Sequence, residues 1–256
     1  LELFYSRRIG KVLPDGSEVP LQLGTKAFGR LGDWEYGGFL AMTGDKDYTQ
    51  DGERGTEPRA YFSSVRLKRQ ILDNSSVGVL FVGKHAPNHD DGVIDIDGAF
   101  RASDWQLSYQ FARSFKNREG GLASSAGFLM TKENMMLFIR GRYISDEFDV
   151  NQVGYVPWIG TGELTSIGGP RWYFKDGYIR QMMLLGGFSL NRKNVESYTD
   201  QSAVLIFNMQ FRDNWGYEFA YLMGRSKDQG IVYDSYELNY SLWFNISPKW
   251  YGNTGG

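Results

Sequence analysis

The chain has 256 residues, a net charge of −2 and no cysteine. The near-neutral charge excludes the strong basic field of a nucleic-acid-binding protein, and the lack of cysteine excludes disulfides, thiolate metal sites and a cysteine nucleophile. Glycine is abundant at 32 residues, and aromatic residues make up 16% of the chain. No apolar run approaches the ~20 residues of a membrane helix, and no glycine loop has the pattern that cradles a phosphate, so we expect no cofactor.

Apolar and polar residues alternate with a period of two along most of the chain, which is typical of strands. The alternation is clearest at 105–112, 205–211, 217–223 and 236–246. We predict fourteen strands, which in chain order span 1–9, 19–29, 33–43, 59–72, 77–85, 93–101, 105–116, 122–130, 135–146, 163–174, 178–190, 201–212, 215–225 and 233–247. Many are long enough to cross a bilayer, for which a tilted strand needs about 9 to 11 residues.

The predicted connections alternate in length. Every second connection is a short turn containing Asp, Asn or Gly, as tight turns favour; these turns are 73–76, 102–104, 131–134, 175–177 and 212–214. The connections between them are longer and polar, namely 44–58, 86–92, 147–162, 191–200 and 226–232, with the short 117–121 as the exception. Short turns at one end and long loops at the other are typical of outer-membrane barrels.

Aromatic residues follow the short turns directly. Trp34, Trp105, Tyr178, Trp215 and Trp250 each stand at such a position. Amphipathic rings gather at the boundary between membrane and water, so we predict that these five residues lie at the membrane interface.

The strand faces opposite the apolar ones carry charge. We predict that these faces line the lumen through Arg66, Lys68, Asp95, Asp97, Arg140, Arg142, Glu218 and Glu237. They admit two interpretations, a charged constriction that selects solutes or ion pairs that fill the lumen, and pairing is the commoner case. The predicted fold is an antiparallel transmembrane β-barrel with about 14 strands in this span. A soluble barrel or sandwich would alternate identically; strand length, turn asymmetry and the aromatic positions favour the membrane.

Several segments resemble an uncharacterised family of bacterial outer-membrane proteins. Residues 3–10 are similar to its FFSRRIG element, 24–30 to its GxKxxGR strand, 64–78 to its RxKRdxxxxSsvG hairpin and 92–97 to its gvDf strand. Members carry a periplasmic domain similar to carbohydrate-binding module family nine, followed by a barrel. The resemblance implies residence in the outer membrane of a Gram-negative bacterium. It also implies that 1–256 is a barrel fragment, without the N-terminal domain and further C-terminal strands.

Two groups of residues could hold other chemistry. His85 and His89, beside Asp90 and Asp91, could form a metal site or the His–Asp pair of a hydrolase, although a solvated outer loop is the simpler interpretation. The spacing of Asp45, Asp47 and Asp51 approaches that of a calcium loop, but a true calcium loop needs another oxygen ligand in its middle, where this chain has 48–50 (Tyr-Thr-Gln), and a bidentate acid at its end. We therefore predict no catalytic residue and keep both groups as weak metal candidates.

The predicted function is a pore, or a membrane scaffold for an attached periplasmic domain that binds glycans. The glycan rests on the family resemblance alone. The alternatives are a non-conducting subunit of an outer-membrane complex and a hydrolase embedded in the barrel. The expected partners are outer-membrane lipid, lipopolysaccharide and other envelope proteins, with no nucleic acid.

Overall fold

The protein is all-β in the computed structural model, which describes residues 12–87, 89–117, 119–156, 158–247 and 249–256. The strands are β1 (Leu21–Leu31), β2 (Trp34–Thr43), β3 (Lys46–Gln50), β4 (Glu53–Glu57), β5 (Ala60–Ile71), β6 (Ser75–Ala86), β7 (His89–Arg101), β8 (Trp105–Lys116), β9 (Leu122–Lys132), β10 (Met135–Ile144), β11 (Thr161–Tyr173), β12 (Ile179–Lys193), β13 (Tyr198–Phe211), β14 (Trp215–Asp228), β15 (Ile231–Ser247) and β16 (Trp250–Gly255). Within those described ranges, no helix is long and apolar enough to cross a membrane.

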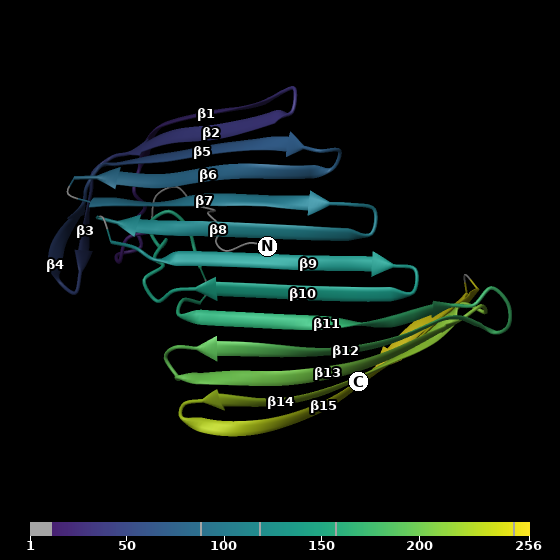
Figure 1. Cartoon of the computed structure of the whole chain (residues 1–256). Helices are drawn as coiled ribbons and strands as arrows, with labels where there is room; N and C mark the ends of the chain where they lie inside the picture. The colour runs from purple at the N-terminus through teal and green to yellow at the C-terminus, as the bar shows by residue number, and fades with distance from the viewer. Residues whose placement is uncertain (1–11, 88, 118, 157, 248) are drawn as a thin grey trace. The chain divides into compact units, whose positions relative to one another are not determined.

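Fourteen strands form one antiparallel sheet, in which each strand lies beside the next along the chain (Figure 1). The order runs β1-β2-β5 and then in sequence to β16, while β3 and β4 form a separate hairpin between β2 and β5. Short turns favour this arrangement, because antiparallel neighbours need only a few connecting residues. In the described part of the chain, β1 and β16 each have one neighbour in the sheet, so the sheet is not closed.

The alternation in the sequence predicts the strands well. The predicted strand 1–9 lies outside the described residues, and each of the others coincides with one strand of the large sheet. The hairpin β3–β4 lies inside the predicted loop 44–58, and β16 was not predicted. The alternation finds the longer strands because they have one apolar face each; β3, β4 and β16 have five, five and six residues, too few for a clear period.

The predicted contrast in connection length is only partly correct. The predicted long loops 86–92, 191–200 and 226–232 shrink to 87–88, 194–197 and 229–230, because the strands on both sides continue further than expected. Two long connections remain, 44–59 with its hairpin and 145–160. Near these strand ends both faces carry polar side chains, so apolar and polar residues no longer alternate. The ends of the strands are therefore predicted as parts of the loops.

The chain divides into two compact units. The first comprises 1–101, 108–125 and 144–160, and the second comprises 102–107, 126–143 and 161–256. Each unit is considered by itself below.

In both units the strands have an apolar face and a polar face. In the first unit, the register places Val65 opposite Phe81 and Phe81 opposite Ile94, which share the apolar face. In the second unit, Leu205 lies opposite both Gly186 and Tyr221 on the apolar face. The apolar faces are exposed, with 50% of Val65, 50% of Ile96 and 53% of Leu205 accessible.

Candidate functional site

The polar face of the first unit carries a connected set of charged side chains. Arg66 on β5 forms a bidentate ion pair with Asp97 on β7, in which Nη2 lies 2.8 Å from Oδ1. Asp95, which is only 1% exposed, accepts a hydrogen bond of 2.6 Å from Gln110 on β8. The register places these residues on one face because Leu80 lies opposite both Arg66 and Asp95, and Gly78 lies opposite Asp97.

Lys68 lies on the same polar face, at the end near the short turns. Its Nζ lies 3.5 Å from Glu35 on β2, and both side chains are partly exposed. Of the four predicted lumen residues in the first unit, Arg66 and Asp97 therefore pair with each other, whereas Lys68 and Asp95 have other partners. Pairing between strands satisfies charges that would be costly if isolated.

The second unit repeats the arrangement with different partners. Arg142 on β10 contacts Glu163 on β11 at 2.6 Å, and Glu218 on β14 accepts a hydrogen bond of 3.0 Å from Asn208 on β13. Glu237 on β15 accepts one of 2.8 Å from Asn239. The buried Nε atoms of Arg140 and Arg142 have no hydrogen-bond partner among the described residues, although Arg142 contacts Glu163 through Nη2.

The connection 145–160, here called the inner loop, packs on the polar face of the first unit. Its Phe148, Val150 and Val153 are buried in one cluster with sheet residues, which are Val82, Val93, Ala112, Ala123 and Ile144. Val82 and Val93 lie opposite each other, next to the opposite pair Lys84 and Asp91 on the same strands, so their side chains share one region of the sheet. The inner loop therefore covers part of the charged face.

Polar contacts hold the inner loop to the sheet at several points. The hydroxyl of Ser114 on β8 accepts a hydrogen bond from the amide of Asp149 at 3.1 Å, and Lys116 contacts the Asp149 carboxylate at 3.2 Å. The amide of Asn151 donates to the same carboxylate, and this bond, together with Lys116, holds the pKa of Asp149 below its usual range despite partial burial.

A second anchor lies at Lys84 on β6, whose side chain is 7% exposed. Its ammonium group donates to Gln152 of the inner loop at 2.9 Å and to Glu57 at the end of β4 at 3.2 Å. Lys84 thus joins both long connections to the polar face. These anchors are not predicted from the sequence, where the only signal is the apolar residues at 148, 150 and 153 in a polar stretch.

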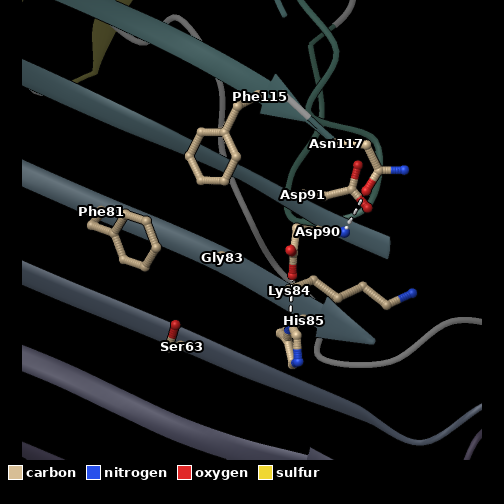
Figure 2. Close-up of a pocket in the computed structure, with 9 residues that line it drawn as sticks. All are labelled: Ser63, Phe81, Gly83, Lys84, His85, Asp90, Asp91, Phe115 and Asn117. Atoms are coloured by element: carbon tan, nitrogen blue, oxygen red, sulfur yellow. Dashed lines mark hydrogen bonds and ion pairs between the residues drawn. The ribbon is translucent and has the colours of Figure 1, made fainter. Parts of the chain in front are cut away.

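The apolar face of the first unit contains a cavity of 660 Å³ near the strand ends that carry the longer connections (Figure 2). Gly83 on β6 lines it, and Gly92 lies opposite Gly83 on β7. The rings of Phe81 and Phe115 stack beside it with centroids 6.2 Å apart. A β-carbon on Gly92 would lie 2.8 Å from the Val82 carbonyl oxygen and closer still to the Phe115 ring, so glycine is needed there.

Polar residues line the rest of this cavity. His85 Nδ1 contacts the Asp90 carboxylate across β6 and β7, and the amide of Asp90 donates to Asn117 at 2.9 Å. Ser63 on β5 lines the same cavity, two positions from Tyr61, the residue opposite His85. The predicted loop at 86–92 is wrong, because these residues belong largely to β6 and β7, although the side chains of His85 and Asp90 are exposed.

The two histidines do not converge. His89 pairs with Asp91 and lies opposite Ala86, whereas His85 lies opposite Asp90, one position further along both strands. Successive residues of a strand point to opposite faces, so the two imidazoles lie on opposite faces of the sheet. Among the residues that the structure describes, no group of three or more His, Asp and Glu is placed to hold a metal ion.

The aspartates of the calcium-like spacing are dispersed along the hairpin β3–β4. Asp45 accepts a hydrogen bond from the Arg59 amide at 2.7 Å, and Asp47 accepts one from the Thr56 hydroxyl at 2.7 Å. Asp51 stands in the turn between the strands with a φ of 52°. A strand separates residues along an extended line, which removes the convergence that a calcium loop requires.

The predicted interface aromatics stand at the strand ends next to the short turns. Trp34, Trp105, Trp215 and Trp250 each begin a strand, and Tyr178 directly precedes β12. Trp215 donates a hydrogen bond of 2.9 Å to the Tyr178 hydroxyl and stacks on Phe211 at 4.0 Å.

No family model, no curated protein and no solved structure matches the chain.

Proposed function

We propose that the chain forms the wall of a transmembrane β-barrel pore in the outer membrane of a Gram-negative bacterium. The observation that carries the proposal is the division of the sheet into an exposed apolar face and a paired, charged face. A lipid-facing wall needs the first, and a water-filled lumen accepts the second.

The apolar face is difficult to reconcile with water. Monomeric soluble proteins rarely expose contiguous apolar patches larger than a few hundred Å², and here the exposed face continues from strand to strand within each unit. Strand length supports the same proposal. From β5 to β15 the strands have between 10 residues, in β10, and 17 residues, in β15, and a tilted membrane strand needs about 9 to 11.

The edges of the sheet set a condition on this proposal. Unpaired backbone groups cannot face lipid, because each costs several kcal/mol without water. In the membrane, β1 and β16 must therefore be paired, either with each other or with further strands. An even number of strands permits antiparallel closure. The family resemblance favours further strands and an attached periplasmic domain that binds glycans.

Single-channel conductance of the purified protein in a planar bilayer tests the pore. We expect discrete steps whose ion selectivity shifts when Arg140 and Arg142 are both replaced by Gln, because these cations lie on the charged face. Arg180→Gln serves as the matched control, since Arg180 is an exposed arginine on β12 near a short turn. Silence in a folded, membrane-inserted sample would contradict the pore and favour a non-conducting scaffold or a subunit of an outer-membrane complex.

A second candidate function, hydrolysis of an acyl ester, rests on the cavity in Figure 2. Ser63, His85 and Asp90 line it together, and the Asp90 carboxylate contacts His85 Nδ1. In such a site Ser63 Oγ attacks the ester carbonyl, His85 Nε2 takes the serine proton and returns it to the leaving alcohol, and water then releases the acid. Ser63 and His85 form no hydrogen bond in the described structure. Their side chains must therefore move closer together before His85 can take the proton of Ser63.

Ester hydrolysis is tested with phospholipid in mixed micelles. The expected result for this candidate is acid release that is lost in Ser63→Ala and in His85→Ala but retained in Ser64→Ala, the neighbouring serine on the other face of β5. Equal rates in all four proteins, or no release by any of them, would eliminate the hydrolase.

A further inference from the structure

Arg140 on β10 is a cation for which the described chain supplies no counter-ion. Its side chain is partly buried, its Nε is buried without a hydrogen-bond partner, and it forms no ion pair among the residues that the structure describes. Arg142, two positions further along the same face, contacts Glu163 at 2.6 Å. A charge that is partly removed from water is costly unless it is paired. Arg140 is therefore a place where an anion from outside the chain can bind.

The carboxylates on the neighbouring strands of this face already have cationic partners. Glu163 on β11 pairs with the neighbouring arginine, and Asp200 on β13 contacts Lys193 on β12 at 3.0 Å. The Asp200 carboxylate also accepts a hydrogen bond of 2.9 Å from the Lys227 amide. Neither carboxylate is left over to neutralise Arg140, so the polar face of the second unit keeps an unbalanced positive charge at this point.

The register of β10 and β11 places Thr165 opposite Arg140. The Arg171 amide donates to the Asn134 carbonyl at 2.9 Å, which aligns the two strands near their short turn. Position 140 lies six residues from Asn134, and position 165 lies six residues from Arg171 in the other direction, so an antiparallel pair brings them together. The contact between positions 142 and 163 fits the same alignment.

Small residues continue this row across the polar face of the second unit. Thr165 lies opposite Ser189, Ser189 opposite Ser202, Ser202 opposite Gly224, and Gly224 opposite Ser235. None of these side chains is larger than that of threonine, so the row leaves room for a bound molecule beside the guanidinium group. The next residues of this face on β11, β13 and β14, toward the short turns, are the apolar Ile167, Val204 and Leu222. An apolar border strengthens charge interactions, because it lowers the local dielectric constant.

Thr165 and Ser189 supply polar groups beside the guanidinium. Their hydroxyl oxygens lie 3.0 Å apart, and either hydroxyl can be the donor. Whichever donates, the hydrogen of the other hydroxyl stays available in the described structure, because each hydroxyl has one donor and two acceptor positions. A guanidinium group donates through a planar fork that matches two oxygens of a carboxylate or a phosphate. The cation and the spare hydroxyl hydrogen together suit an oxyanion.

We propose that Arg140, with the hydroxyls of Thr165 and Ser189, binds the oxyanion group of a small solute, a carboxylate or a phosphate, on the lumen side of the barrel wall. This inference rests on the proposed function, because the pore gives the solute its access to the polar face. It deepens that function by naming a chemical group that the pore holds during passage.

Direct binding to the purified full chain in detergent micelles tests the site. The probes are ¹³C-labelled acetate and inorganic phosphate, each followed by the broadening of its ¹³C or ³¹P resonance. We expect broadening that is lost in Arg140→Gln and retained in Arg180→Gln, the exposed arginine near a short turn of β12. Broadening of acetate alone identifies a carboxylate site, of phosphate alone a phosphate site, and of both a general oxyanion site. Broadening of neither probe, or equal broadening with Arg140→Gln, would overturn the proposal.

Two further variants test the recognition itself. Arg140→Lys keeps the charge without the planar fork, and we expect it to weaken the broadening of both probes. The double variant Thr165→Val with Ser189→Ala removes the hydroxyl pair, and we expect weaker broadening than in Ser166→Ala, where the hydroxyl lost lies on the other face of β11 and opposite Phe188. Wild-type broadening in both the lysine variant and the double variant would mean that charge alone attracts the probes, and the built site would be refuted.

Binding in micelles requires no conduction, so the inference and the function on which it rests can fail separately. If the wild-type protein conducts in a bilayer but broadens neither probe, the pore stands and the oxyanion site fails. If the probes bind and Arg140→Gln abolishes their binding while no protein conducts, the oxyanion site stands and the pore fails.

Discussion

Arg66 on β5 and Asp97 on β7 form a bidentate pair over β6, where Gly78 lies opposite Asp97 in the register. A β-carbon on Gly78 would lie 2.8 Å from Nη2 of Arg66, so the missing side chain makes the room through which the guanidinium reaches Asp97. The pair spans three strands, and its strength depends on all three keeping their register.

Removing one partner of this pair leaves a half-buried charge without its counter-ion, since about a third of the Arg66 side chain is exposed (33%). For Asp97→Asn we expect the free energy of unfolding in urea to fall by about 1–3 kcal/mol, as for a charged hydrogen bond that loses its partner. Glu35→Gln breaks the more exposed pair with Lys68 and is expected to cost at most about 1 kcal/mol. Equal losses in the two variants would contradict the importance of the Arg66–Asp97 geometry.

The Arg66–Asp97 pair shows which part of the charged face can be predicted from the sequence. Alternation places Arg66, Asp95 and Asp97 on the faces opposite the apolar ones, because a period of two assigns every residue of a strand to one side. It does not say which charges meet, since that depends on the register across two hairpins. Arg66 and Asp97 pair, whereas Asp95 meets Gln110, and no pattern within one strand distinguishes these outcomes.

The errors have a different physical cause. The predicted loops 86–92 and 147–162 are both polar and both lack a clear period; the first is wrong, whereas the second is confirmed as the connection 145–160, whose packing was not predicted. The first is mostly strand, because its polar pairs His85–Asp90 and Lys84–Asp91 lie opposite each other on the two faces. The second is irregular but packed, because Phe148, Val150 and Val153 find a partner surface formed by distant strands. Tertiary contacts decide both cases, and a single sequence does not contain them.

The attachment of the inner loop depends on pH through Asp149. The pKa of this carboxyl is lowered by the Asn151 amide and by Lys116, so the folded value lies below the unfolded value of about 3.9. A lowered folded pKa contributes stability above the unfolded pKa, and this contribution is lost as the pH falls through the folded pKa.

We therefore expect hydrogen-exchange protection of residues 148–153 to be constant at neutral pH and to decrease in strongly acidic solution, after correction for intrinsic rates. In Asp149→Asn the protection should be lower at neutral pH and should show a weaker acid transition. Identical profiles for both proteins would mean that Asp149 does not hold the loop.

Gly92, which lies opposite Gly83 of the cavity lining, is sensitive to added volume. In Gly92→Ala the new methyl group meets the Val82 carbonyl and the Phe115 ring, and we expect a loss of about 1–3 kcal/mol in the free energy of unfolding, typical of overpacking. Gly186→Ala is the matched control, because a β-carbon there meets nothing within 4 Å. Urea unfolding monitored by tryptophan fluorescence compares the two, and an equally stable Gly92→Ala protein would refute the close approach of Phe115.

The most direct test of the membrane proposal uses a single charge on each face of β13. Leu205 lies on the apolar face and is 53% exposed, and Ser202 is an exposed residue on the polar face. If the apolar face meets lipid, Leu205→Arg costs about 2–4 kcal/mol near the bilayer midplane, whereas an arginine on the lumen side costs little. In water both positions would accept arginine, because both side chains are exposed. We therefore expect Leu205→Arg to lower the free energy of unfolding in liposomes and Ser202→Arg to leave it nearly unchanged. If both variants folded in liposomes as stably as the wild type, the apolar face would not be facing lipid, and the large sheet would need a different cover.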